Sequence, residues 1–190
     1  MSESIRIDLA RLGDGLPGVS KRRGGEHYEA AIICLTSQSH VSGVKCKVKD
    51  LEETRSELEL RWSEQVTTQV ENSWNDLEEA TEKGAAGIAI LVILELTEYT
   101  ILRRAEKDTG IDYWLAYQRD VKDLGENVLK HAARLEVSGI LEQNPNNTIR
   151  RRVKRKLEQS KFSDKTRLPA YVLVAEFSIP EVCMVSREVS

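Results

Sequence analysis

Apolar residues in the first third of the chain recur at two spacings, which predict a helix followed by a pair of strands. Between residues 26 and 38 the apolar positions lie three or four apart, the interval of one helix face. Apolar and polar residues then alternate over 44–48 and again over 58–62, as in a half-buried β-hairpin. The segment up to Arg23 contains several glycines and a proline, and we expect a loosely ordered arm there.

A second helical stripe begins near Ser63 and is much longer. Apolar residues keep helical spacing over 66–91, and Ser63 is a suitable N-cap with Glu64 in the first turn. The apolar run 85–94 falls well short of the ~20 residues that cross a bilayer. We therefore expect one long core helix and no association with a membrane.

The second half of the chain alternates between short apolar runs and one amphipathic stretch. Runs rich in β-branched and aromatic residues predict strands near 99–102, 111–118, 132–140 and 170–177. An Asn-Pro-Asn-Asn segment precedes a helix predicted over about residues 148–159. The predicted order is therefore helix, three strands, helix and strand.

Length and composition favour one folded domain with an extension. A chain of 190 residues, 40% hydrophobic and 31% charged, can bury one sizeable core. We place an N-terminal extension at 1–62, the core domain at 63–180 and a tail at 181–190. The three cysteines lack the spacing of a disulfide framework or a zinc site, and the N-terminus lacks the layout of a signal peptide. We therefore expect a cytoplasmic protein.

Basic residues are concentrated in and after the second predicted helix. Residues 147–167 contain nine Lys or Arg and two Asp or Glu, a net charge of +7 in a chain whose overall charge is −3. The candidate nucleic-acid-binding residues of this segment are Arg150, Arg151, Lys154 and Arg155. Such a surface suits a phosphate backbone. A solvated helix face or an acidic protein partner would account for the same charge.

Two acidic residues lie on successive predicted strands. Asp112 follows Gly110 at the start of one strand, and Glu136 lies inside the apolar run of the next. Because side chains alternate across a strand, both carboxylates can lie on the same side of the sheet. Paired carboxylates suit Mg²⁺ or Mn²⁺. The structural alternatives are a turn at Asp112 and an ion pair of Glu136 with Arg134 or with the basic helix.

The order of these acids and elements resembles the restriction-endonuclease-like PD-(D/E)xK superfamily. There an aspartate opens one strand and a (D/E)xK triplet lies on the next; here the triplet is Glu136-Val137-Ser138, with serine in the position of the lysine. The resemblance implies an α/β fold with an αβββαβ core, a mixed sheet flanked by helices, preceded here by an N-terminal helix and β-hairpin extension. It also implies Asp112, Glu136 and Ser138 as catalytic positions, with Asp112 and Glu136 as Mg²⁺ ligands.

The resemblance also implies a further acid and a cation. The acid would come from the first core helix, where Glu82 matches the acidic helix motif and Glu95 lies on the apolar stripe itself. The lysine of the superfamily can migrate, and Lys154, Arg150 and Lys130 are the candidates to replace it.

Two functions are consistent with this pattern. The first is a metal-dependent nucleic-acid phosphodiesterase, an endonuclease of the kind that serves bacterial restriction, repair or phage defence, in which the basic helix gathers the backbone. The second keeps the fold without the chemistry, as a binding or assembly module in a multiprotein complex. The missing lysine favours the module, and the two acids favour the nuclease.

Overall fold

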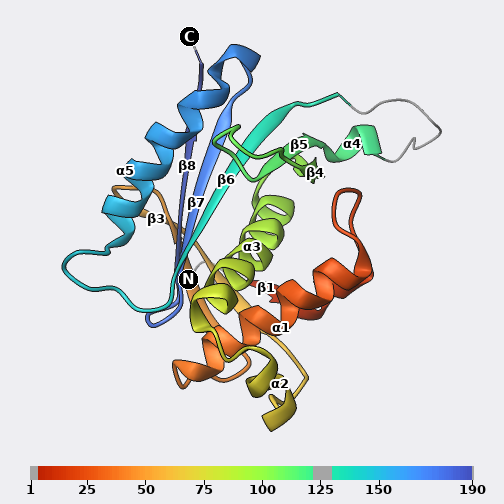
Figure 1. Cartoon of the computed structure of the whole chain (residues 1–190), viewed down its shortest axis with the longest axis vertical. Helices are drawn as coiled ribbons and strands as arrows, with labels where there is room; N and C mark the ends of the chain where they lie inside the picture. The colour runs from red at the N-terminus through yellow and green to blue at the C-terminus, as the bar shows by residue number, and fades with distance from the viewer. Residues whose placement is uncertain (1–3, 122–129, 190) are drawn as a thin grey trace.

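The computed structural model describes residues 4–121 and 130–189, and they form three layers around one mixed β-sheet (Figure 1). The strands are β1 Ile5–Asp8, β2 Val44–Lys49, β3 Thr54–Arg61, β4 Tyr99–Arg104, β5 Tyr113–Tyr117, β6 Ala133–Ile140, β7 Ala170–Glu176 and β8 Glu181–Arg187. The helices are α1 Lys21–Ser37, α2 Thr68–Ser73, α3 Leu77–Leu96, α4 Gln118–Val121 and α5 Ile149–Ser160, with 3₁₀ turns η1 Leu9–Asp14 and η2 Lys161–Thr166. The predicted α/β class is therefore confirmed.

The sheet has eight strands in the order β1-β3-β2-β8-β7-β6-β5-β4. β4, β5 and β6 form an antiparallel meander, and β6 runs parallel to β7. The predicted hairpin is also present, since β2 and β3 pair antiparallel. No helix in the described part of the chain combines the length and apolar composition needed to cross a bilayer.

Helices cover both faces of the sheet. α1 and α3 pack side by side on one face, and α5 lies on the other (Figure 1). Alternate residues of β6 divide between the two layers: Leu135 and Val137 belong to the core under α3, whereas Ile140 packs with Ile149 and Val153 of α5. Glu136 shares the parity of Ile140, so its side chain lies on the α5 face.

The prediction of a loosely ordered N-terminal arm is wrong. Its residues Ile5–Asp8 form β1, which runs parallel to β3, and the carboxylate of Asp8 caps η1 by accepting from the amide of Ala10. Leu9 and Leu12 are fully buried in the main core. Burial of these apolar residues orders the segment in spite of its glycines.

The prediction of one long helix capped by Ser63 is also wrong. The chain forms the short α2 and then restarts as α3, whose N-cap is Asp76. The Asp76 carboxylate accepts from the amides of Glu78 and Glu79, which satisfies donors at a new helix start. The apolar stripe therefore spans two helices with a break between them.

The predicted tail, residues 181–190, instead contains β8, which lies inside the sheet. β8 pairs antiparallel with β7 and parallel with β2, and its residues Val182 and Cys183 are buried. It joins the N-terminal hairpin to the core strands, so that the sheet continues across the boundary predicted at residue 62.

The sheet opens on one side of β6, and this opening positions the candidate site. β5 pairs with β6 only from Tyr113 opposite Leu135 to Leu115 opposite Ala133. β6 continues beside β7 as far as Ile140. The other edge of β6 beyond Leu135 is therefore free of β5, and residues from both helical layers can reach it.

Candidate active-site cleft

A cleft of about 940 Å³ lies along this free edge of β6. Its walls come from α1 and α3 on one side, the turn between β4 and β5, and α5 with the start of η2 on the other. Gly139 lets α3 approach β6 closely, because a Cβ there would lie 2.4 Å from the carbonyl oxygen of Thr81. Both helical layers therefore meet at the cleft.

Asp112 and Glu136 both line the cleft, next to each other. The amide of Asp112 donates to the carbonyl oxygen of Leu135, and Asp112 Oδ2 accepts from the amide of Val137 at 2.9 Å. Asp112 immediately precedes β5, and its carboxylate is bound to the neighbouring strand rather than to its own turn. The two carboxylates therefore come from the residues next to Tyr113 and Leu135, the pair at which the β5–β6 ladder ends.

The Glu136 carboxyl is buried and strongly perturbed. Burial first, and then the negative charge of Asp112, raise the pKa of Glu136 to about 8, although Lys156 opposes this shift. Glu136 Oε1 accepts from Lys156 Nζ at 2.5 Å and from Gln159 Nε2 at 3.0 Å. Glu136 Oε2 is buried and has no hydrogen-bond partner within the described chain. One oxygen of a costly buried carboxyl is thus available to a ligand.

Lys156, rather than Lys154, Arg150 or Lys130, brings a cation to the triplet. The side chain of Lys156 is 16% exposed and forms an ion pair with Glu136. A signal for it was present in the sequence, since Lys156 lies seven positions after Ile149 and three after Val153, on the buried side of α5. Of the two ion pairs considered for Glu136, the one with the basic helix is formed; Arg134 pairs with Asp164.

A second cation occupies the surroundings of Ser138. Arg152 Nη1 donates to Ser138 Oγ at 3.0 Å, and Arg152 Nη2 donates to Asn147 Oδ1. Ser138 and Arg152 both line the cleft. Ser138 is therefore next to a guanidinium group in the cleft.

Of the two acidic candidates on α3, one lines the cleft and the other does not. Glu82 lines the cleft, in the first half of α3. Glu95 lies in the last turn of α3, forms an ion pair with Arg11 and does not line the cleft. The structure thus brings Glu82, Asp112, Glu136 and Ser138 to one cavity and leaves Glu95 outside it.

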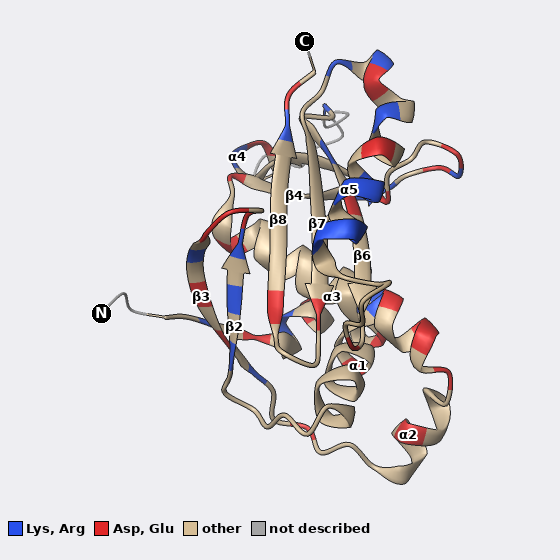
Figure 2. Cartoon of the chain, turned by 90° about the vertical axis from the view of Figure 1, so that its left-hand side faces the viewer, with Lys and Arg blue, Asp and Glu red and all other residues tan. Residues whose placement is uncertain are grey.

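The candidate nucleic-acid-binding residues of α5 also differ in whether they line the cleft. Lys and Arg follow α5 along much of its length (Figure 2). Only Arg155 of the four candidates lines the cleft, whereas Arg150, Arg151 and Lys154 are exposed and lie outside its lining. The other walls carry basic residues that sequence reasoning missed, namely Arg23, Lys83, Arg104 and Lys107. They come from segments far apart in the sequence, so no local cluster of basic residues indicated that they share one surface.

His27 is a further cleft residue without a sequence signal. Its Nδ1 lies 2.9 Å from the carbonyl oxygen of Lys83, an acceptor, so Nδ1 carries the proton of that hydrogen bond. Burial lowers the pKa of His27, which favours the neutral ring with Nε2 as an acceptor. His27 thus adds a neutral acceptor to the wall formed by α1 and α3.

The residues can supply part of a metal site. Within residues 4–121 and 130–189, no three His, Cys, Asp or Glu side chains gather as a metal-binding group. Asp112 and Glu136 form a pair of oxygen donors, and Mg²⁺ is commonly held by one or two carboxylates together with water and substrate phosphates. The unpartnered Oε2 of Glu136 and the neighbouring Asp112 fit such an ion.

Comparisons with known proteins do not assign a family. The sequence matches no model of a known protein family. It also matches none of the curated proteins. The candidate site therefore depends on its own geometry.

Proposed function

We propose that this protein is a metal-dependent nucleic-acid phosphodiesterase of the PD-(D/E)xK type in which Lys156 replaces the lysine of the triplet. The observation that carries the proposal is the environment of Glu136. Its carboxyl is buried in a cleft next to Asp112, Lys156 donates to one oxygen, and the other oxygen has no hydrogen-bond partner among the residues that the structure describes. Burying a carboxyl in this way costs free energy, and buried carboxyls with strongly shifted pKa values occur preferentially at functional sites.

The arrangement of elements supports the same proposal. α3, β4, β5, β6, α5 and β7 occur in this order along the chain, with the short helix α4 inserted between β5 and β6. Helices lie on both faces of the mixed sheet, as the resemblance implies. Asp112 immediately precedes β5 and Glu136 lies in β6, an arrangement similar to that of the aspartate and the (D/E)xK triplet in the superfamily.

The charged residues of the cleft have distinct roles in the proposed reaction. Asp112 and Glu136 would hold Mg²⁺ or Mn²⁺, which when bound supplies charge neutralisation at the phosphate and lowers the pKa of water. Lys156 donates to Glu136 and would stabilise the charge that develops on the scissile phosphate. Glu82 offers a further acceptor from α3. Arg155 and Arg104, on separate walls, would bind the flanking phosphates.

Lys156→Ala tests the proposal against Lys154→Ala, a matched control on the same helix and outside the cleft. We expect the parent to cleave DNA or RNA with Mg²⁺ or Mn²⁺, and Lys156→Ala to lose about 10²–10³-fold in rate, as when one preorganised charge-stabilising donor is removed. Lys154→Ala should cleave like the parent. Adding Ser138→Lys to Lys156→Ala returns a cation to the triplet and should recover part of the rate. Full activity of Lys156→Ala would contradict the assignment.

The alternative function is a binding or assembly module without catalysis. It is favoured by Ser138 and by the contact of Lys156 with Glu136, which gives one oxygen of the buried carboxyl a hydrogen-bond partner without a metal ion. Titration calorimetry with Mn²⁺ separates the two functions. If the protein is a module, the parent should bind no Mn²⁺ and cleave neither DNA nor RNA. If it is a nuclease, the parent should bind Mn²⁺ and Glu136→Gln should abolish this binding.

A further inference from the structure

Phe162 is an exposed aromatic side chain at the cleft. It is 72% exposed, lies in η2 directly after α5, and lines the same cavity as Glu136 and Lys156. Single exposed apolar residues are common and need no function. Ile179 is such a residue, since it is 71% exposed and does not line the cleft. Phe162 differs because of its place and the way its backbone is held.

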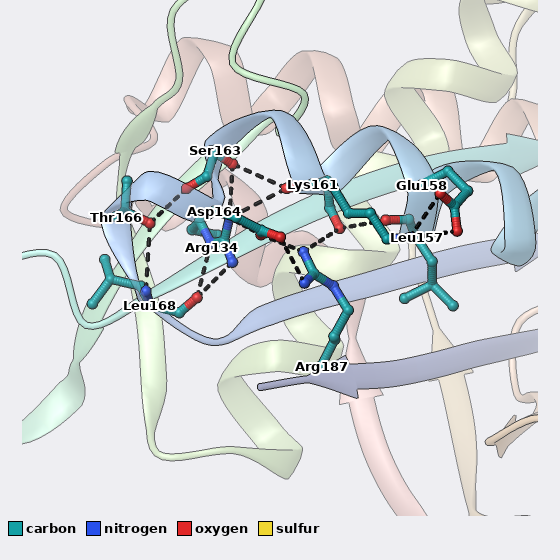
Figure 3. A network of polar contacts seen from close by, with 10 residues as sticks. Arg134, Leu157, Glu158, Lys161, Ser163, Asp164, Thr166, Leu168 and Arg187 are labelled. Atoms are coloured by element: carbon teal, nitrogen blue, oxygen red, sulfur yellow. Dashed lines mark hydrogen bonds and ion pairs between the residues drawn. The ribbon is translucent and has the colours of Figure 1, made fainter. Parts of the chain in front are cut away.

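A buried arginine fixes the turn that carries Phe162 (Figure 3). Arg134 of β6 is fully buried, and its guanidinium donates to Ser163 Oγ at 2.9 Å, to Asp164 Oδ1 at 3.2 Å and to the carbonyl oxygen of Leu168. Arg187 of β8 binds Asp164 as well. η2 is therefore tied to two strands of the sheet, and Phe162 projects from a rigid support.

The turn between β4 and β5 packs against the other side of this support. Gly110 has a φ of 71°, and a Cβ on it would lie 2.2 Å from the carbonyl oxygen of Gln159 and 3.2 Å from Cβ of Phe162. The turn that leads into Asp112 thus touches the base of Phe162. The backbone and Cβ of Phe162 therefore have a defined position relative to the turn that leads into Asp112, while the ring remains exposed.

We propose that Phe162 stacks on an unpaired base of the bound nucleic acid, so that the preferred substrate is single-stranded or locally unpaired. This inference rests on the proposed function. Sites for single strands combine a basic groove with aromatic platforms, and a base face is free for stacking only where the base is unpaired. Arg155, Lys156 and Lys107 line the same cleft and supply the basic groove.

Binding measurements test the inference without catalysis. With Ca²⁺ in place of Mg²⁺, fluorescence anisotropy compares a short labelled single strand with its duplex for the parent, Phe162→Ala, Phe162→Trp and the control Ile179→Ala. We expect Phe162→Ala to weaken single-strand binding on the order of tenfold and duplex binding much less. Phe162→Trp should bind single strands at least as well as the parent. The control Ile179→Ala should bind single strands and duplex with the affinities of the parent.

A single strand with an abasic position provides a second test, because it lacks the base on which the Phe162 ring would stack. Scanning one abasic position along the strand should locate a site at which the parent and Phe162→Ala bind equally. Equal losses for single strand and duplex, or no loss with Phe162→Ala, would overturn the stacking inference and leave the nuclease proposal standing. A parent that binds neither form with Ca²⁺ and cleaves neither with Mg²⁺ would overturn both.

Discussion

Glu136 shows how one residue couples folding stability to the candidate chemistry. Its pKa of about 8 in the fold exceeds the ordinary value of 4.5, because burial and Asp112 disfavour the ionised form. The folded state therefore holds a proton between these two values that the unfolded state has released. Stability from this group is present at low pH and is lost as the pH rises through the interval.

Replacing this carboxyl should remove that pH dependence. In EDTA, the free energy of unfolding of the parent should fall between about pH 4.5 and pH 8, by up to a few kcal/mol, relative to Glu136→Gln. Urea denaturation of both proteins across this range measures the difference. Parallel pH profiles would show that the Glu136 carboxyl is ionised in the fold.

At the scale of elements, the position of η2 depends on one buried guanidinium. Arg134 donates to backbone and side-chain oxygens of the segment 160–168, and Arg187 binds Asp164 from the other side. These two arginines lower the pKa of Asp164, with Arg187 the larger cause. The segment has few buried apolar residues of its own, so polar contacts set its position.

Arg134→Met should therefore destabilise the fold and release η2. Removing one partner of a buried ion pair costs about 3 kcal/mol or more, because the remaining acceptors stay desolvated. We expect the urea midpoint to fall accordingly, while Arg150→Met, at an exposed position on α5, should leave it near that of the parent. An unchanged midpoint for Arg134→Met would mean that the segment is held by other contacts.

At the scale of the whole molecule, basic residues from separate elements converge on the cleft. Arg104 comes from β4 and Arg155 from α5, and both line the cavity, whereas Arg151 and Lys154 of α5 do not. A bound backbone should therefore contact both walls and pass by the exposed residues of α5. In the proposed nuclease, phosphate binding would therefore involve both walls of the cleft rather than α5 alone.

The double variants Arg104→Ala/Arg155→Ala and Arg151→Ala/Lys154→Ala remove the same charge and separate these two surfaces. The first should weaken binding uniformly across sequences and reduce the slope of log affinity against log salt by roughly 0.7–0.9 for each lost phosphate contact. The second should keep the parent slope. The reverse result in salt titrations would move the binding surface to the exposed face of α5.

The sequence by itself determined the alternating strands and the two acids, because these depend on local periodicity, but it did not predict the short helix α4 between β5 and β6. Alternation along β6 already separates Glu136 from Leu135 and Val137, and the helical interval from Ile149 to Lys156 was available to find the cation. Local spacing also misled, since the stripe of α3 continued across the break at Asp76.

Only the tertiary structure decided which strand edges pair and which residues line the cleft at the end of the β5–β6 ladder. β8 lies inside the sheet because it pairs with both β7 and β2. The residue pattern within 181–190 does not indicate these two pairings. The early end of the β5–β6 ladder leaves an edge to which α1, α3 and α5 all contribute. Residues such as His27 and Phe162 join Glu136 there through contacts between segments distant in the chain, and long-range contacts of this kind have no local period to reveal them.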